Sequence, residues 1–221
     1  MSKTNCVESV GVVLDRVIRE ISEPATKEKP INIETWGEWF QFQTLGDPQL
    51  EAMLRAASRF ILDVKEGVEG PWLVLLGTSG AGKSHLAKRV WRWWTKSGQW
   101  YVHNGTGANL VKTGQFCLWA DYVQECREGD FSRTSDLISD DLVVLDDIGA
   151  GTDGRKWMAD KLYHILEKRL DEGKATMLTA NLSLEQLAEA YEVRITSRLI
   201  RRGVDKVVDV DVPDYKLRRL T

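Results

Sequence analysis

Residues 77–84 read Gly-Thr-Ser-Gly-Ala-Gly-Lys-Ser, a full match to the phosphate-loop pattern GxxxxGK[ST]. Glycines in such a loop let backbone N–H groups turn inward around a polyphosphate. Lys83 supplies a positive charge for the β- and γ-phosphates, and the Ser84 hydroxyl supplies a ligand for Mg²⁺. We therefore predict that ATP contacts the loop and the residue after it: Gly77, Thr78, Ser79, Gly80, Ala81, Gly82, Lys83, Ser84 and His85.

A second group of polar residues lies in the segment Asp140–Gly149, where an apolar run ends in two carboxylates. We expect this run to be a strand next to the strand of the phosphate loop, so that both acids reach the γ-phosphate. Asp146 would then hold Mg²⁺ or its water shell, and Asp147 would polarise the attacking water. Asn181 ends the following apolar run, where its amide could hold the same water, although Asn is also a common turn residue.

Alternating strand and helix patterns must position these residues. Short apolar runs predict buried parallel strands at 72–76, 116–119, 142–145 and 176–180, with a last strand at 207–212. Helices are expected from Asp47 and Pro48 as N-cap and first residue, from about 155 to 171, and from Ser183 with its capping-box partner Gln186. The order predicts an α/β fold, a doubly wound parallel sheet with helices on both faces.

Composition narrows the class of protein without naming a function. The chain has 221 residues, 43% of them hydrophobic and 29% charged, which is ordinary for a soluble globular protein. No apolar stretch approaches the length of a membrane span, and the first residues lack a signal peptide pattern, so we expect a cytoplasmic protein without membrane contact. The three cysteines share no metal-ligand spacing and are expected to be reduced thiols.

The net charge of −3 conceals a local asymmetry. The segment 70–120 contains Lys and Arg but no Asp or Glu, which suits a protein that handles phosphates on one face. Its aromatic residues could stack on the bases of single-stranded DNA, although Trp91 and Trp94 are better explained by packing of their helix on the sheet. Lys112 and His103, in what looks like a long connection from 100 to 115, are better candidates for DNA contact, together with Arg92.

Residues 1–30 stand apart from the domain at 31–221. Apolar residues at helical spacing predict an amphipathic helix, and a charged linker with two prolines follows it. This helix either docks a partner or packs back on its own domain, and the sequence leaves both possibilities open.

Together, five segments resemble the DnaC/IstB-like AAA+ ATPases, in the order typical of that family: 77–87, 142–150, 179–183, 193–199 and 214–216. The resemblance covers about residues 35–221 and is strongest to the DnaC-type bacterial or phage replicative helicase loaders. It implies Walker A roles for Lys83 and Ser84, a Walker B role for Asp146, a catalytic role for Asp147 and a sensor 1 role for Asn181.

The resemblance also implies that Arg198 is an arginine finger, with Arg194 one helical turn earlier on the same face. Both could otherwise be ordinary surface arginines. A finger acts on the γ-phosphate of a neighbouring subunit, so nucleotide-dependent self-assembly is expected, with hydrolysis that depends on it. Asp147 has a shorter reach than the Glu found in many AAA+ proteins, which favours slow turnover. Few residues follow Asn181, which predicts an AAA+ domain that lacks the C-terminal helical lid.

These features predict an ATP-dependent helicase loader that assembles on single-stranded DNA and helps load a replicative hexameric helicase. A transposition helper ATPase of the IstB kind shares the same core and differs in its partner. A nucleotide-gated binding adaptor with negligible hydrolysis is a further alternative. A small-molecule kinase is disfavoured because no acceptor-binding segment is evident.

Overall fold

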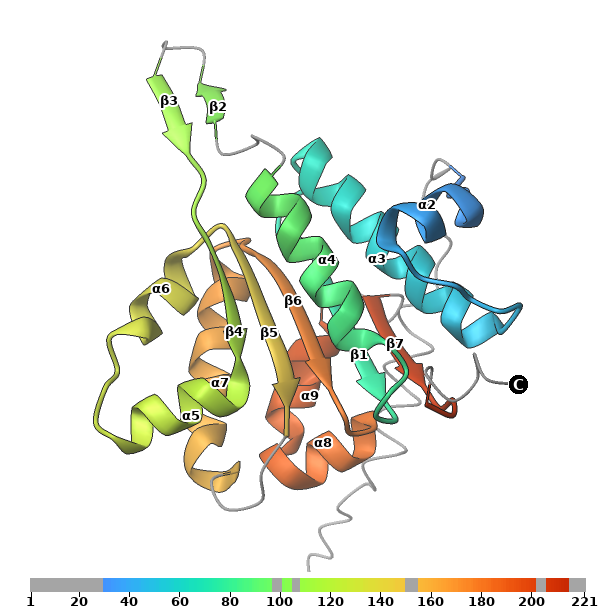
Figure 1. The fold of residues 1–221 in the computed structure, drawn as a ribbon. Coiled ribbons are helices and arrows are strands. Elements are labelled where there is room, and N and C mark those ends of the chain that lie inside the picture. Colours follow the sequence, from blue (N-terminus) through green and yellow to red (C-terminus); the bar gives the residue numbers. More distant parts are fainter. Residues whose placement is uncertain (1–29, 97–100, 105–107, 150–154, 202–205, 215–221) are drawn as a thin grey trace, which may run out of the picture.

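The computed structural model describes residues 30–96, 101–104, 108–149, 155–201 and 206–214, with backbone only for 101–104, 108–111, 155 and 156. Its centre is a parallel sheet of five strands in the order β4-β5-β6-β1-β7 (Figure 1). The strands are β1 (Trp72–Gly77), β4 (Gly114–Leu118), β5 (Leu142–Ile148), β6 (Ala175–Ala180) and β7 (Val207–Val210). Each pairing between neighbours is parallel, as the buried apolar runs predicted.

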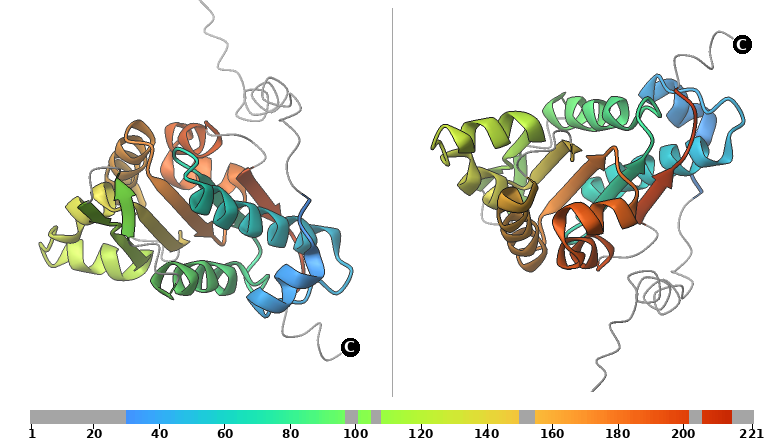
Figure 2. Two further views of the ribbon diagram at one scale, coloured as in Figure 1. Left: turned by 90° about the horizontal axis from the view of Figure 1, so that it is seen from above. Right: turned by 90° about the horizontal axis from the view of Figure 1, so that it is seen from below.

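Helices cover both faces of this sheet, as Figure 2 shows. On one face lie α2 (Ile33–Phe40), α3 (Pro48–Glu66) and α4 (Lys83–Lys96). On the other lie α5 (Trp119–Arg127), α6 (Arg133–Ser139), α7 (Arg155–Asp171), α8 (Leu184–Tyr191) and α9 (Val193–Ile200). This arrangement confirms the doubly wound α/β fold, and no helix follows β7 in the described residues.

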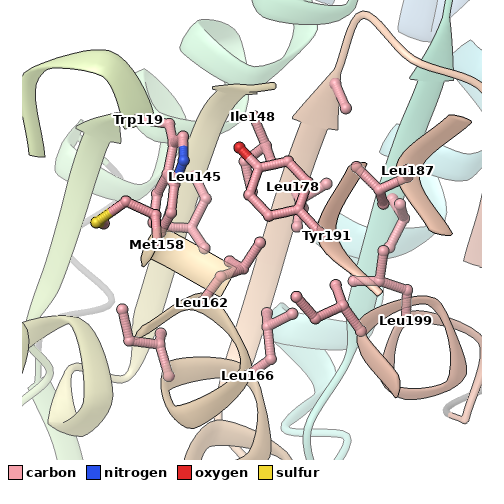
Figure 3. Close-up of a cluster of buried hydrophobic side chains, with 14 of the residues drawn as sticks. Trp119, Leu145, Ile148, Met158, Leu162, Leu166, Leu178, Leu187, Tyr191 and Leu199 are labelled. Atoms are coloured by element: carbon pink, nitrogen blue, oxygen red, sulfur yellow. The ribbon is translucent and has the colours of Figure 1, made fainter. Parts of the chain in front are cut away.

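Alternate residues of the central strands divide the core into two halves. Val143 and Leu145 point toward α7, whereas Leu142 and Val144 belong to the cluster under α3 and α4. Figure 3 shows the first half, in which Leu178 of β6 packs among residues of α7, α8 and α9. Because both faces of these strands are buried, they read as continuous apolar runs rather than alternating ones.

Local sequence signals place several element ends correctly. Asp47 caps α3 by accepting hydrogen bonds from the backbone N–H groups of Gln49 and Leu50. The capping box of Ser183 and Gln186 is present at the start of α8. The expected helix at about 155–171 coincides with α7.

The predicted position of the acidic strand is wrong. β5, which carries Asp146 and Asp147, does not neighbour β1, because β6 lies between them. The order of the strands depends on which strands pair with one another. The sequence of a single strand does not reveal its partners. Both acids nevertheless lie at the same carboxyl edge of the sheet as the phosphate loop, because all five strands run in one direction.

The connection expected at 100–115 is a two-stranded antiparallel hairpin, β2 (Tyr101–Asn104) and β3 (Ala108–Val111). In Figure 1 it projects from the end of the sheet opposite the tips of β1, β5 and β6. The side chain of His103 and the amphipathic helix expected in residues 1–30 lie outside what the structure describes, apart from Pro30. No helix in the described ranges has both the length and the apolar character needed to cross a bilayer.

One buried cation fixes the amino ends of the strands. Arg169 of α7 is fully buried and donates hydrogen bonds to five oxygens, at distances of 2.6–3.1 Å. Its acceptors are the carbonyls of Leu137, Ile138, Asp140 and Ala175 and the hydroxyl of Thr176. Burial lowers the pKa of its guanidinium to about 10, which still leaves it charged at neutral pH. Arg169 thus ties α6 and the turn before β5 to the start of β6.

Candidate nucleotide-binding site

The loop between β1 and α4 has the backbone conformation of a phosphate cradle. Gly82 has a φ of +100°, and a Cβ there would lie 2.6 Å from the Phe42 ring. At Gly77, where φ is +108°, a Cβ would lie 2.0 Å from the carbonyl oxygen of Val210. Side chains are therefore excluded by conformation and by space at both positions. The loop leads directly into the N-terminus of α4, where helix dipoles favour an anion.

The loop is also anchored to its neighbours on both sides. The backbone N–H of Gly77 donates to the Leu182 carbonyl after β6, at 3.1 Å. The N–H of Thr78 donates to the carbonyl of Val210 on β7 at 2.9 Å, and the Thr78 hydroxyl donates to Val212 at 2.7 Å. These bonds hold the cradle at the carboxyl edge of the sheet.

Lys83 lies under the loop with its ammonium group turned toward it. Its Nζ donates to the carbonyl oxygens of Gly77 and Thr78 at 2.9 and 2.6 Å. The side chain is 4% exposed, and burial lowers the pKa of this ammonium to about 8, against the opposing effect of nearby acids, first of all Asp147. A phosphate brought to this position would raise that pKa again, so Lys83 would bind it in the charged form.

A β-bulge at Asp146 and Asp147 changes the direction in which the side chains of β5 point. Between β5 and β6 the pairing passes from Leu145↔Leu178 to Ile148↔Ala180, so β5 has one residue more than β6 in this interval. Consecutive residues of a regular strand point to opposite faces, but a bulge re-aims one of them. Asp147 has the left-handed φ of +61° at this bulge, which is uncommon for a residue other than glycine.

The hydroxyl of Thr179 is bonded to both acids of the bulge. It donates to Asp146 Oδ1 at 2.7 Å and accepts from the backbone N–H of Asp147 at 2.9 Å. Asn181, which directly follows β6, donates from its side-chain nitrogen to Asp147 Oδ1 at 2.6 Å. The amide predicted to hold a water is thus bonded to the second acid itself.

The environments of the two acids differ. Asp146 is buried, at 2% exposure, and Asp147 is half-buried at the cavity surface. Burial, with a further contribution from Asp146, raises the pKa of the Asp147 carboxyl above its usual range. A raised pKa makes Asp147 a better proton acceptor, as general-base chemistry requires.

Oxygen ligands suited to Mg²⁺ are present at this edge. Ser84 lines the cavity, and the buried Asp146 carboxylate accepts a hydrogen bond from the Thr179 hydroxyl. Mg²⁺ prefers oxygen ligands and is commonly held by one or two carboxylates together with phosphates and water. The described residues contain no group of three or more His, Cys, Asp or Glu that could form a metal cage by themselves. The donors present therefore fit a magnesium ion that arrives with a nucleotide.

A cavity of about 590 Å³ lies between the loop and Asp147. Of the predicted residues it is lined by Ser79, Gly80, Gly82, Lys83, Ser84, His85, Asp147 and Asn181. Gly77 and Ala81 are buried, and the backbone N–H of Thr78 donates to Val210 of β7. The volume falls within the range of about 300–1,000 Å³ that is usual for ligand pockets.

Three residues of this cavity were missed by the sequence reasoning. Gln41 and Phe42 follow α2, and the ring of Phe42 stacks on His85 with centroids 6.3 Å apart. His85 in turn is hydrogen-bonded to the carbonyl oxygen of Phe40, at 2.8 Å. Asp214, beyond β7, lies against Gly80. Asp214 could have been predicted, because it belongs to the segment 214–216 that resembles the family. Nothing local in the sequence marks Gln41 or Phe42.

The two candidate arginines lie together on α9, away from the cavity lining. The guanidinium groups of Arg194 and Arg198 lie over the Tyr163 ring, 4.6 and 5.1 Å from its centroid. Arg198 also pairs with Glu167 and donates to the Tyr163 hydroxyl at 2.8 Å, while Arg194 pairs with Asp160. These contacts confirm that the two arginines share a face of α9, and they leave both outside their own chain's nucleotide cavity.

Three features define a P-loop AAA+ protein. They are the phosphate loop after β1, the two carboxylates of β5, and the strand β6 between β5 and β1, which is followed by the polar Asn181. The family of IstB-like ATP binding proteins matches residues 40–219. The chain belongs to this DnaC/IstB-like AAA+ family. No match was found among curated proteins.

Solved structures with the same fold include replication proteins. The crystal structure of DnaI is 19% identical, covers 83% of this chain and 93% of its own, and has a TM-score of 0.61. The DnaC helicase loader is 20% identical, with coverages of 72% and 88% and a TM-score of 0.54. The replication initiator DnaA, bound to AMPPCP and single-stranded DNA, is 19% identical, with coverages of 72% and 46% and a TM-score of 0.53.

Proposed function

We propose that the protein is an ATP-dependent helicase loader, which assembles on single-stranded DNA and helps load a replicative hexameric helicase. The observation that carries this proposal is the meeting of Lys83, Asp147 and Asn181 in one cavity beneath a complete phosphate loop. Membership of the IstB-like ATP binding family supports nucleotide binding. Similarity in fold to DnaI and to the DnaC helicase loader supports the loader role.

In this proposal each residue has a defined task. The loop N–H groups and Lys83 bind the β- and γ-phosphates, and Ser84 and Asp146 hold Mg²⁺, which when bound neutralises phosphate charge. Asp147 accepts the proton of the attacking water, helped by its raised pKa. Asn181 orients Asp147 through their hydrogen bond.

Arg198 completes the site from a second copy of the chain. Arg198 lies on α9, outside the cavity lining of its own subunit, and in this proposal its guanidinium reaches the nucleotide of a neighbouring copy. Such a head-to-tail arrangement produces a ring or a filament, and hydrolysis then depends on assembly. Arg194, one turn away over the same Tyr163 ring, would support Arg198 at that interface.

Measuring ATP hydrolysis with and without a single-stranded oligonucleotide tests the proposed activity. We expect stimulation by the oligonucleotide and a loss of at least about 100-fold in Asp147→Asn, because removal of a general base costs roughly 10²–10⁴ in rate. Asp171→Asn, at an exposed position ending α7, is the control and should behave as wild type. Turnover that is negligible in wild type, with oligonucleotide affinity that responds to ATP, would instead establish a nucleotide-gated adaptor.

A transposition helper ATPase of the IstB kind is the second candidate, favoured by the family that the sequence matches. The two roles share the ATPase and differ in the partner. Capture of the host's replicative helicase by the full chain supports the loader, and capture of a transposase supports the helper. Repeating the capture without residues 1–30 decides whether that segment docks the partner.

A further inference from the structure

A second cavity, of about 400 Å³, lies between the end of α2 and the outer side of α4. Its lining residues are Trp39, Arg89, Arg92, Trp93 and Lys96, and none of them lines the nucleotide cavity. We call this group the Trp39–Trp93 patch. Two aromatic rings and three cations thus line one hollow, without a carboxylate among them.

The patch is assembled from two elements that lie far apart in the sequence. Arg89, Arg92, Trp93 and Lys96 follow one another at helical spacing, so they form one stripe on α4. Trp39 comes from α2, whose C-terminal end lies beside α4 (Figure 2). Arg89 holds it there, because its guanidinium bonds to the Trp39 carbonyl and lies 5.7 Å from the centre of the Trp39 ring.

The Trp39 ring is fixed on one side and open on another. It packs edge-on against Trp36 and Phe40, with ring centroids 5.7 and 4.8 Å away. Even so, 39% of the residue is exposed. A large, rigid and exposed aromatic surface is suited to stacking, because little conformational freedom remains to be lost on binding.

Two of the three cations of the patch, Arg92 and Lys96, are available to a ligand. Arg92 and Lys96 are exposed, and their charged groups have no hydrogen-bond or ion-pair partner among the residues that the structure describes. The hollow therefore combines positive charge with flat apolar faces. A ligand that satisfies both features carries negative charges at intervals and planar groups between them.

We propose that the Trp39–Trp93 patch binds single-stranded DNA, with a base stacked on Trp39 or Trp93 and backbone phosphates at Arg92 and Lys96. This inference rests on the proposed function, in which the chain assembles on single-stranded DNA, and it names the surface that makes the contact. Stacking on an aromatic ring requires an unpaired base, whereas the bases of a duplex are stacked on one another. The patch therefore selects single strands over duplexes.

Fluorescence anisotropy of a labelled oligothymidine with the full chain, Mg²⁺ and a non-hydrolysable ATP analogue tests the patch. We expect Trp39→Ala to weaken binding of the oligonucleotide about tenfold, because a base loses the ring on which it stacks. We expect Arg92→Gln to reduce the slope of log affinity against log salt by about 0.7, because one phosphate contact is lost. Arg92 is exposed, so this second variant keeps the test valid if Trp39→Ala disturbs α2.

Two control variants carry similar changes, the loss of an exposed indole and of an exposed cation, on the opposite face of the sheet. Trp157→Ala removes an indole that is 49% exposed on α7, and Lys168→Gln removes an exposed cation in the last turn of that helix. Both should bind as wild type. A cross-link from a 5-iodouracil oligonucleotide should map to the peptides that contain Trp39 or Trp93.

The outcomes separate this inference from the proposed function. If wild type binds the oligonucleotide and both patch variants bind it equally well, the Trp39–Trp93 patch does not bind single-stranded DNA, and the loader proposal stands. If wild type fails to bind single strands in any nucleotide state, both are wrong. Equal affinity for a duplex, or loss of helicase capture with oligonucleotide binding intact, would also overturn the assignment of this surface to single-stranded DNA.

Discussion

Replacing Thr179 by valine isolates the hydroxyl that links the two acids of β5. Valine keeps the shape of the side chain and removes a donor to buried Asp146 and an acceptor for the Asp147 N–H. A buried polar group left without its partner costs about 1–3 kcal/mol, and hydrogen bonds to charged groups are at the upper end. We therefore expect Thr179→Val to lower the free energy of unfolding by about 3 kcal/mol.

Thr179→Ser is the matched control because it keeps the hydroxyl and removes only a buried methyl, worth about 0.8 kcal/mol. Urea unfolding, followed by circular dichroism, measures both variants. For a domain of this size 1 kcal/mol corresponds to roughly 2–4 °C in Tm, so the valine variant should melt roughly 6–12 °C below wild type.

The same two variants should separate in function. Without its hydroxyl partner Asp146 is no longer fixed, and loss of such a supporting bond typically weakens metal binding about 10–100-fold. The magnesium dependence of ATP hydrolysis should shift accordingly in Thr179→Val and stay near wild type in Thr179→Ser. Equal stability and equal magnesium dependence in the two variants would refute the role given to this hydroxyl.

Three further results are expected. ATP affinity should fall as pH rises above about 8, where Lys83 loses its charge in the free protein, and titration calorimetry of Lys83→Met should show weak binding without this pH dependence. Gly82→Ala should abolish ATP binding because its Cβ meets the Phe42 ring, whereas Gly129→Ala, with a φ of +86° in open space, should cost only strain of about 1–3 kcal/mol. Unaltered ATP binding in Gly82→Ala would contradict the cradle geometry. Arg169→Met should lower the free energy of unfolding by at least about 3 kcal/mol, measured in urea, with unchanged turnover per folded molecule.

The fold was predictable because its signals are local. The apolar run before the glycine loop, the Asp47 cap and the Ser183 capping box each act within a few residues, and each is present as expected. The helix α2 was not predicted, although Asn32 caps it by accepting a hydrogen bond from the backbone N–H of Thr35. The position of α2 beside α4 depends on His85 and Arg89, which are hydrogen-bonded to the carbonyl oxygens of Phe40 and Trp39. These partners are about 45–50 residues apart in the chain.

Eight of the residues marked from the sequence line one cavity, whereas the geometry that joins them was less predictable. A pattern of two acids after a strand does not reveal that β6 separates them from the loop strand, or that a bulge aims Asp147 at Asn181. Both depend on pairing between strands more than 30 residues apart in sequence. Thr179 was within reach of sequence reasoning, since it lies two residues before Asn181, which was already marked, and side chains two apart in an extended chain point the same way.

Complementation between two inactive variants tests most directly whether the ATPase site is shared between subunits. Asp147→Asn keeps Arg198 but cannot activate water, and Arg198→Ala keeps its own acids but offers no finger. Each alone should bind ATP without assembly-stimulated hydrolysis. Mixed in equal amounts, they should recover about a quarter of the wild-type rate, since random head-to-tail pairing joins an intact acid to an intact finger in that fraction of interfaces. A mixture no more active than its separate components, with ATP binding and assembly intact, would contradict the shared site.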